Sequence, residues 1–194
     1  MSGSRGYIMQ KFSFQPTQLE GVLLVKPFVS EDNRGAFIKD YSLDVFKANG
    51  LDYELKEVFY TESIKGVVRA LHFQSNHQQA KLVRCISGKI FDVVVDLRPG
   101  SKTFGHYEAF ELSGTNKDQL LIPEHFGHGY LVLEDSIVSY KCAEKFYAED
   151  DDGIQWDDPD IAIQWPLHLV DHVILSDRDT QLQSFKAFKE KGTL

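Results

Sequence analysis

The feature that most limits the fold of this chain is a succession of short strand-like runs separated by turn residues. Runs rich in Val, Ile, Leu, Phe and Tyr alternate with Gly, Pro, Asn, Asp and Ser along most of the sequence. We expect strands at 21–29, 36–41, 57–63, 67–73, 81–87, 89–97, 105–113, 118–122, 129–134 and 137–146. Runs of this length and spacing predict an all-β protein, either a sandwich or a jelly-roll β-barrel with a small-ligand cavity.

Local signals add turns and short peripheral helices to this pattern. Ser87-Gly88 predicts a tight hairpin between two of the strands. Residues 43–48 are expected to form a short helix, and residues 180–191 have helical character near the end of the chain. The acidic stretch 149–153 is expected to be a solvated loop.

Composition and charge exclude several classes of protein. The 194 residues are 42% apolar and 26% charged, with a net charge of −8. This acidic balance argues against nucleic-acid binding and against anionic membrane surfaces. No apolar run approaches the roughly 18 residues of a membrane span, and the N-terminus lacks an apolar signal-peptide core, so we expect a cytoplasmic protein. We expect one domain over 10–194, preceded by a leader over 1–9.

The first informative block is GVVRALHFQSNHQQAKLVR at 66–84. It contains Arg69, His72 and Lys81, which could converge on one cavity if the strand bends after Arg69. Such a polar group inside a barrel would be costly without an anionic or carbonyl ligand. The alternative is that Arg69 and Lys81 are exposed and His72 is a hydrogen-bonded core residue.

A second block, IPEHFGHGY at 122–130, can be combined with the first. Gly66 is followed by His72, and Pro123 is followed five residues later by His128. This spacing resembles the two sequence motifs of the cupin superfamily, whose fold is a jelly roll. The resemblance therefore predicts a cupin-like β-barrel.

The cupin motifs also indicate whether a metal is expected. Metal-binding cupins have a second histidine where this chain has Gln74, and a carboxylate where it has Gln78 or Gln79. The two remaining imidazoles, His72 and His128, would make a poor divalent-metal site. We expect metal-free chemistry and no cofactor. A metal-dependent cupin, such as a dioxygenase, and a non-catalytic sugar-binding cupin remain as alternatives.

A more specific resemblance extends over nearly the whole chain. The chain is similar to the dTDP-4-dehydrorhamnose 3,5-epimerase family of isomerases, which makes the precursor of L-rhamnose. The matching segments are DNRG at 32–35, GVVRALHFQ at 66–74, QAKLVR at 79–84, GKIFDVVVDLR at 88–98, SKTFG at 101–105, IPEHFGHGYLVLED at 122–135, YKC at 140–142, GIQWDDPDIAIQWP at 153–166 and ILSDRD at 174–179.

The resemblance implies a role for particular residues. It makes His72 and Asp179 a basic dyad, and it places Tyr140 on the opposite face of a nucleotide-linked sugar. It assigns Lys81 to catalysis near the sugar carbonyl. The residues that it assigns to substrate binding are Arg34, Phe37, Arg69, Gln74 and His128. It also implies a homodimer.

The proposed chemistry suits these residue types. A carbon α to a ketone loses its proton only if the enolate oxygen is stabilised, by about 3–4 kcal/mol per positioned donor. Lys81 and Arg69 could supply such donors, and histidine is a base that titrates near neutrality. With the ketone at C4 of the sugar, C3 and C5 are both α positions, so one base and one acid could invert both centres.

Departures from the family pattern concern nucleotide contacts. Lys39 replaces a usual glutamate, and Glu57-Val58-Phe59 replaces a Gln-x-Asn pattern. An epimerase of a different nucleotide 4-keto sugar, or one that inverts only one centre, is therefore an open alternative.

Overall fold

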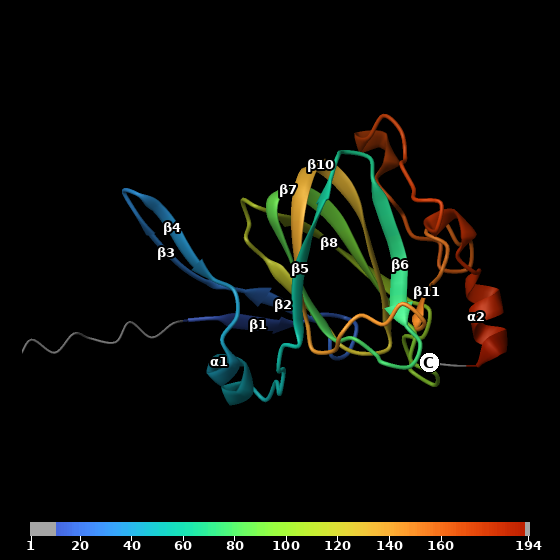
Figure 1. Ribbon diagram of the computed structural model, residues 1–194, viewed down its shortest axis with the longest axis horizontal. Coiled ribbons are helices and arrows are strands. Elements are labelled where there is room, and N and C mark those ends of the chain that lie inside the picture. Colours follow the sequence, from blue (N-terminus) through green and yellow to red (C-terminus); the bar gives the residue numbers. More distant parts are fainter. Residues whose placement is uncertain (1–10, 193–194) are drawn as a thin grey trace, which may run out of the picture.

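A computed structural model describes residues 11–192 of the chain, which are mostly β-strand with short peripheral helices (Figure 1). The strands are β1 Ser13–Pro16, β2 Leu23–Lys26, β3 Phe28–Asp32, β4 Gly35–Lys39, β5 Glu57–Ser63, β6 Val68–Gln74, β7 Lys81–Asp96, β8 Tyr107–Ser113, β9 Gln119–Ile122, β10 Phe126–Cys142 and β11 Asp151–Gly153. The α-helices are α1 Leu43–Ala48 and α2 Phe185–Lys191, and single 3₁₀ turns lie at Leu167–Leu169 and Asp179–Gln181. In this part of the chain, no helix is long and apolar enough to cross a membrane.

Two long antiparallel strands, β7 and β10, organise the molecule. The first half of β7 and the second half of β10 lie in a sheet with β1, β2, β9 and β5. Their other halves lie with β8, β6 and β11, and these two layers, called the first and the second sheet below, are parts of one continuous nine-stranded sheet. Register shifts between Val132 and Val138 mark the place where the paired strands pass from one sheet to the other. The all-β jelly-roll fold expected from the sequence is confirmed.

Each sheet is covered on both faces, and three apolar clusters result. The central cluster lies between the two sheets and includes Ile90, Val94 and Tyr130. The outer face of the second sheet is covered by the C-terminal segment and α2, whose Phe185 and Phe188 are buried. The outer face of the first sheet is covered by α1 and the loop after it. This double burial explains why β7 carries a nearly continuous apolar run instead of strict alternation.

The tight hairpin predicted at Ser87-Gly88 is wrong, because β7 continues through it. Both halves of β7 pair with β10, so no chain reversal occurs there. Gly88 has φ +77°, and a Cβ atom on it would lie 2.1 Å from the Asp135 carbonyl oxygen of β10. The glycine therefore allows the two strands to approach closely at their bend. Likewise, the two strands predicted at 129–134 and 137–146 form one strand, β10, which pairs with β7 on both sides of the bend.

The solvated acidic loop predicted over 149–153 is also wrong in part. Asp151–Gly153 forms β11, which pairs with β6 beside the central cavity. Asp150 is buried and accepts hydrogen bonds from Asn76 and His77. The helix predicted over 43–48 is confirmed, whereas only the second half of 180–191 is α-helical. The leader predicted over 1–9 lies outside the described residues.

Candidate active site

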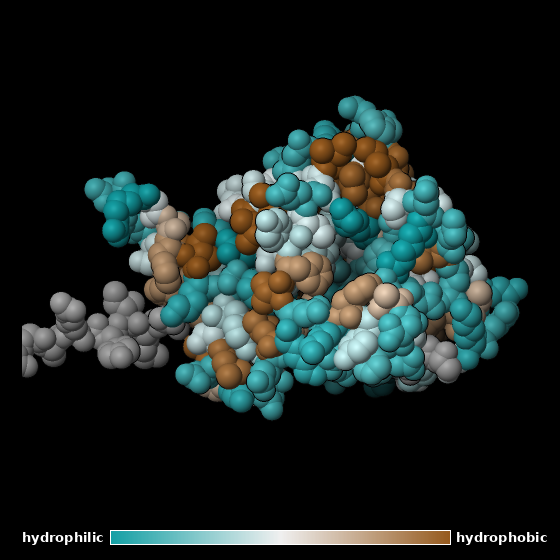
Figure 2. Space-filling view, viewed as in Figure 1, coloured by the Kyte–Doolittle hydropathy of each residue, from teal (hydrophilic) through white to brown (hydrophobic). Residues whose placement is uncertain are grey.

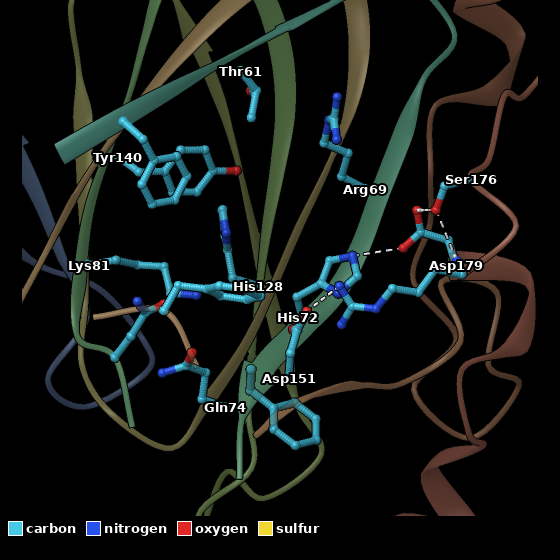
Figure 3. Close-up of a pocket in the computed structure, with 15 residues that line it drawn as sticks. Thr61, Arg69, His72, Gln74, Lys81, His128, Tyr140, Asp151, Ser176 and Asp179 are labelled. Atoms are coloured by element: carbon cyan, nitrogen blue, oxygen red, sulfur yellow. Dashed lines mark hydrogen bonds and ion pairs between the residues drawn. The ribbon is translucent and has the colours of Figure 1, made fainter. Parts of the chain in front are cut away.

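A cavity between the two sheets gathers most of the residues singled out in the sequence. His72, Asp179, Tyr140, Lys81, Arg69, Gln74 and His128 all line it (Figure 3). They come from β6, β7, β10 and the C-terminal segment, which are far apart in the sequence. The other lining residues are Phe59, Thr61, Phe73, Gln79, Phe146, Asp151, Ser176 and Arg178.

The predicted His–Asp dyad is present at one side of the cavity. His72 Nε2 lies 2.7 Å from Asp179 Oδ1, and Ser176 Oγ donates to Asp179 Oδ2 at 2.7 Å. Burial alone would raise the pKa of Asp179, but the hydrogen bonds from His72 and Ser176 outweigh burial and hold the pKa below its ordinary value. Asp179 therefore stays a carboxylate that orients the His72 ring and leaves Nδ1 as the free ring nitrogen.

An irregularity in β6 allows Arg69 and His72 to face the same cavity although they are three residues apart. His72 pairs with His128 of β10, and Arg69 pairs with Tyr130. Three steps along β6 thus correspond to two steps along β10, as in a β-bulge. Arg69 Nε donates to Ser63 Oγ at 3.1 Å, which fixes the side chain at the cavity wall. This irregularity supplies the bend that Arg69 and His72 need in order to converge on one cavity.

Lys81 and Tyr140 lie on the side of the cavity that the first sheet provides. Burial lowers the pKa of Lys81, and the charges of Cys142, Asp151 and Asp92 only partly oppose this shift. Burial raises the pKa of Tyr140 well above its ordinary value, and Tyr130 and Asp92 raise it further. Tyr140 therefore keeps its proton, as a proton donor must. Lys81, in contrast, loses its positive charge at a lower pH than an exposed lysine does.

A second buried His–Asp pair was not predicted from the sequence. His128 Nε2 lies 2.9 Å from Asp92 Oδ2, and both side chains are buried. Burial raises the pKa of Asp92, and the neighbouring His128 and Lys81 oppose this shift. Asp92 lies within the apolar run IFDVVVD, where a carboxylate that points inward needs a partner. That position in a buried strand is the signal that could have identified it.

A further missed contact holds the segment that carries Asp179. Arg178 forms an ion pair with Asp151 of β11, and both side chains line the cavity. Asp151 pairs with Gln74 of β6, so the C-terminal segment is tied to the strand that carries His72. Figure 3 shows Asp179 and Ser176 on this segment, facing His72 from outside the sheet.

Gln74 contributes to the cavity wall mainly through its amide group. Its Nε2 donates to the carbonyl oxygens of His77 and Lys145, and its Oε1 accepts from the backbone N–H of Tyr147. The amide thus secures two loops at the rim of the cavity. Among residues 11–192, the structure gathers no group of three or more His, Cys, Asp or Glu side chains that could hold a metal ion.

Arg34 and Phe37 do not line this cavity. They lie on the hairpin of β3 and β4, which forms a separate two-stranded sheet. Arg34 is 85% exposed and binds Asp32 at 2.6 Å, and Phe37 is 59% exposed. The hairpin stands clear of the body in Figures 1 and 2.

Sequence comparison identifies relatives over almost the same length. A sequence model of the dTDP-4-dehydrorhamnose 3,5-epimerase family matches residues 16–187. The dTDP-4-dehydrorhamnose 3,5-epimerase of Methanothermobacter thermautotrophicus is 46% identical over 172 residues, which cover 88% of this chain and 93% of the relative.

Solved structures are similar over the whole fold. A dTDP-6-deoxy-D-glucose-3,5-epimerase from Legionella pneumophila, in complex with dTDP-4-keto-L-rhamnose, is 34% identical with a TM-score of 0.89, and the match covers 93% of this chain and 96% of that chain. A 3′-monoepimerase from Streptomyces bikiniensis, in complex with dTDP-quinovose, is 29% identical with a TM-score of 0.84, covering 91% and 90%. The chain belongs to the dTDP-4-dehydrorhamnose 3,5-epimerase family.

Proposed function

We propose that this protein is an isomerase that epimerises the sugar of dTDP-4-dehydro-6-deoxyglucose at C3 and C5 by acid–base chemistry through an enolate. One observation carries the proposal. The His72–Asp179 dyad and the protonated Tyr140 line the same cavity, and Lys81 and Arg69 line it as well (Figure 3). Pure sugar binding does not require a base, an acid and a buried cation in one cavity.

The first step assigns the base. His72 removes the proton from the carbon next to the C4 ketone, and the electron pair of that C–H bond forms the enolate. Asp179, which stays ionised, stabilises the imidazolium that results. Lys81 and Arg69 stabilise the enolate oxygen in a buried environment, where such donors act most strongly.

The second step assigns the acid. Tyr140 delivers its proton to the same carbon from the other face of the sugar, the enolate returns to a ketone, and the configuration is inverted. The same two groups act in turn on the second α carbon, after His72 has released its proton to solvent and Tyr140 has recovered a proton from solvent. His128, held by Asp92, lines the same cavity and contacts the substrate there. No step requires a metal or an organic cofactor.

The substrate phosphates require cations besides those that face the sugar carbonyl, and a second copy of the chain would provide one of them. Arg69 and Lys81 come from the same chain as the base, whereas Arg34 and Phe37 lie on the projecting hairpin. We assign these last two residues to the cavity of a second copy, in a homodimer in which each hairpin completes the other site. Bidentate recognition of phosphate is a property of arginine.

The anchorage of the hairpin supports this arrangement. Asp40, which directly follows β4, accepts from Lys141 Nζ at 2.9 Å and from Arg84 at 3.2 Å. These contacts attach the base of the hairpin to the outer face of the first sheet, so that it extends away from its own body. An isolated two-stranded hairpin with an exposed phenylalanine is marginally stable in water, and a partner would stabilise it.

A second candidate is an epimerase that inverts only one centre. The similar 3′-monoepimerase supports it, because the same fold hosts that outcome. Phe59, an apolar side chain within the cavity, also departs from the expected nucleotide-contacting pattern. The two candidates differ in whether C5 exchanges its hydrogen with solvent.

The proposal is tested by incubating candidate dTDP-4-keto sugars with the enzyme in deuterated water and following C3 and C5 by NMR. The wild-type enzyme should incorporate deuterium at both carbons and invert both. His72→Asn should abolish exchange at both carbons, and Asp179→Asn should lose part of the rate. Tyr140→Phe should slow net inversion more than exchange, because the phenol acts after the proton has left.

Two outcomes would decide against this assignment. Wild-type exchange in the His72 variant, together with complete loss of exchange in the Tyr140 variant, would make Tyr140 the base. A stoichiometric transition metal required for activity would favour the metal-dependent cupin. Cell fractionation tests the cytoplasmic location, which stays a prediction.

A further inference from the structure

Two aromatic rings contact the ring of Tyr140 at the cavity wall. Phe59 of β5 lies directly opposite Tyr140 of β10 in the antiparallel register. The two rings are stacked, with centroids 4.9 Å apart and planes inclined by 11°. His128 meets the Tyr140 ring in a T-shaped arrangement, with centroids 5.9 Å apart and planes inclined by 73°. Both are geometries that aromatic pairs favour.

These two contacts restrict where the Tyr140 hydroxyl can point. The side chain of a tyrosine moves by rotation about two bonds, and a ring packed parallel to it opposes a tilt of its plane. His128 cannot give way easily, because its Nε2 lies 2.9 Å from Asp92 and both side chains are buried. Figure 3 shows the Tyr140 hydroxyl pointing into the cavity.

Phe59 is an unusual side chain for this position. It stands where the resemblance to the epimerase family predicts an asparagine that contacts the nucleotide, and a phenylalanine ring has no strong hydrogen-bonding group. The side chain also lines the cavity and is 41% exposed, which is unfavourable for a large apolar group. Its stacking on Tyr140 gives a reason for an aromatic residue here.

We propose that Phe59 is a positioning residue for inversion, which holds the ring of Tyr140 so that the hydroxyl group faces the substrate carbon. This inference rests on the role of Tyr140 given under the proposed function. In that step the O–H bond of Tyr140 breaks, the electron pair of the enolate forms the new C–H bond, and the tyrosinate later recovers a proton from solvent. The rate of such a transfer depends steeply on the position of the donor.

The test separates exchange from inversion at one carbon. Phe59→Leu keeps an apolar side chain but removes the flat face that packs on Tyr140. His72 still removes the proton in this variant, and its imidazolium exchanges with deuterated water and returns a deuteron to the original face. We expect the ratio of net inversion to deuterium incorporation to fall by roughly tenfold, since a misplacement of about 1 Å can slow a reaction by about a hundredfold.

Paired variants separate this role from a structural one. Phe59→Tyr keeps the ring and should keep the ratio near that of the wild type. Tyr60→Leu is a matched control, because it removes an aromatic ring from the outward face of the same strand, where the side chain is 66% exposed. That variant should leave the ratio unchanged.

A double variant tests whether Phe59 acts through the proton donor. Phe59→Leu combined with Tyr140→Phe should show the same ratio as Tyr140→Phe alone, because the leucine has no donor left to misplace. A further fall of the ratio in the double variant would show that Phe59 acts by another route, and the inference would be overturned.

The other outcomes distinguish this inference from the proposed function. If the wild-type enzyme neither exchanges nor inverts any dTDP-4-keto sugar, the proposed function is wrong. If the wild type inverts its substrate but Phe59→Leu slows exchange and inversion by the same factor, Phe59 does not position the proton donor. Equal ratios for Phe59→Leu and Phe59→Tyr would show that the ring is not needed, and would contradict the inference as well.

Discussion

At the scale of single residues, the charge of Lys81 should make the activity depend on pH. A lysine is a cation below its pKa, and burial lowers the pKa of Lys81. The pKa of Tyr140 is raised, so Tyr140 keeps its proton over the same range. We predict that kcat/KM falls on the alkaline side with a pKa below that of an ordinary lysine, about 10.4, as the cation that stabilises the enolate is lost.

Two variants assign this alkaline limb. Lys81→Arg should move it to higher pH, because a guanidinium stays charged up to a pKa above about 12. Tyr140→Phe should keep the limb at its wild-type position despite a lower rate. The measurement is a profile of kcat/KM against pH for the three proteins. A limb that disappears in Tyr140→Phe would show that the phenol, and not the lysine, titrates there.

The sequence indicated which charged residues belong to the site, but it did not indicate the residues that position them. Polar residues in strand-like runs drew attention to Arg69, His72 and Lys81, and the resemblance to the epimerase family assigned them to the site. Their side chains converge on one cavity because of a β-bulge in β6, which no local sequence pattern predicts. Tyr130 looks like any core aromatic residue in the sequence, and only the contact of its hydroxyl with Thr61 Oγ1 distinguishes it.

At the scale of elements, the bend shared by β7 and β10 depends on Gly88. Its φ of +77° is unfavourable for other residues, and a Cβ atom would lie 2.1 Å from the Asp135 carbonyl oxygen. Gly100 is a matched control, because it has φ +79° and a Cβ atom added to it would have no neighbour within 4 Å. Gly100→Ala should therefore cost only the backbone strain, about 1–2 kcal/mol of unfolding free energy.

Gly88→Ala should cost more than about 3 kcal/mol, because strain and a steric clash with backbone add together. Chemical denaturation of both variants measures the difference. If the two alanine variants were equally stable, the close approach of the strands at Gly88 would not constrain the fold.

The strand positions could largely be predicted, but their continuity could not. Ser87-Gly88 is a good hairpin signal, and the sequence cannot distinguish a chain reversal from a bend within a paired strand. The difference lies in the pairing with β10 on both sides of the glycine. Likewise, the acidic side chains of Asp151–Gly153 predict a loop, but its backbone forms the edge strand of the second sheet beside β6.

At the scale of the whole molecule, the body and the projecting hairpin separate two parts of the proposed site. The apolar run at 21–29 is divided between β2, which joins the first sheet, and β3, which begins the hairpin. Periodicity cannot locate that division, since both halves are strand-like. The charge network around Asp40 then fixes where the hairpin points. A single chain thus holds the proposed base and the proposed acid but keeps Arg34 outside its own cavity.

This separation predicts complementation between two inactive variants. His72→Asn has an inactive cavity and an intact hairpin, and Arg34→Ala combined with Phe37→Ala has the reverse. In a heterodimer with exchanged hairpins, one of the two sites contains only wild-type residues. Co-expression with two different tags, followed by purification on both, should give about half of the wild-type activity per dimer at limiting substrate, while each homodimer stays nearly inactive.

The alternative arrangement predicts the opposite result. If each hairpin served the cavity of its own chain, both sites of the heterodimer would carry a defect and activity would stay at the level of the homodimers. Sedimentation at micromolar concentration provides the control that the tagged pair is a dimer. A monomeric wild-type enzyme with full activity would exclude the exchanged hairpin, since Arg34 cannot then reach a second cavity. Recovery of half the activity would place Arg34 and Phe37 in the partner's site and would explain why an exposed phenylalanine is kept on a hairpin that contacts so little of its own body.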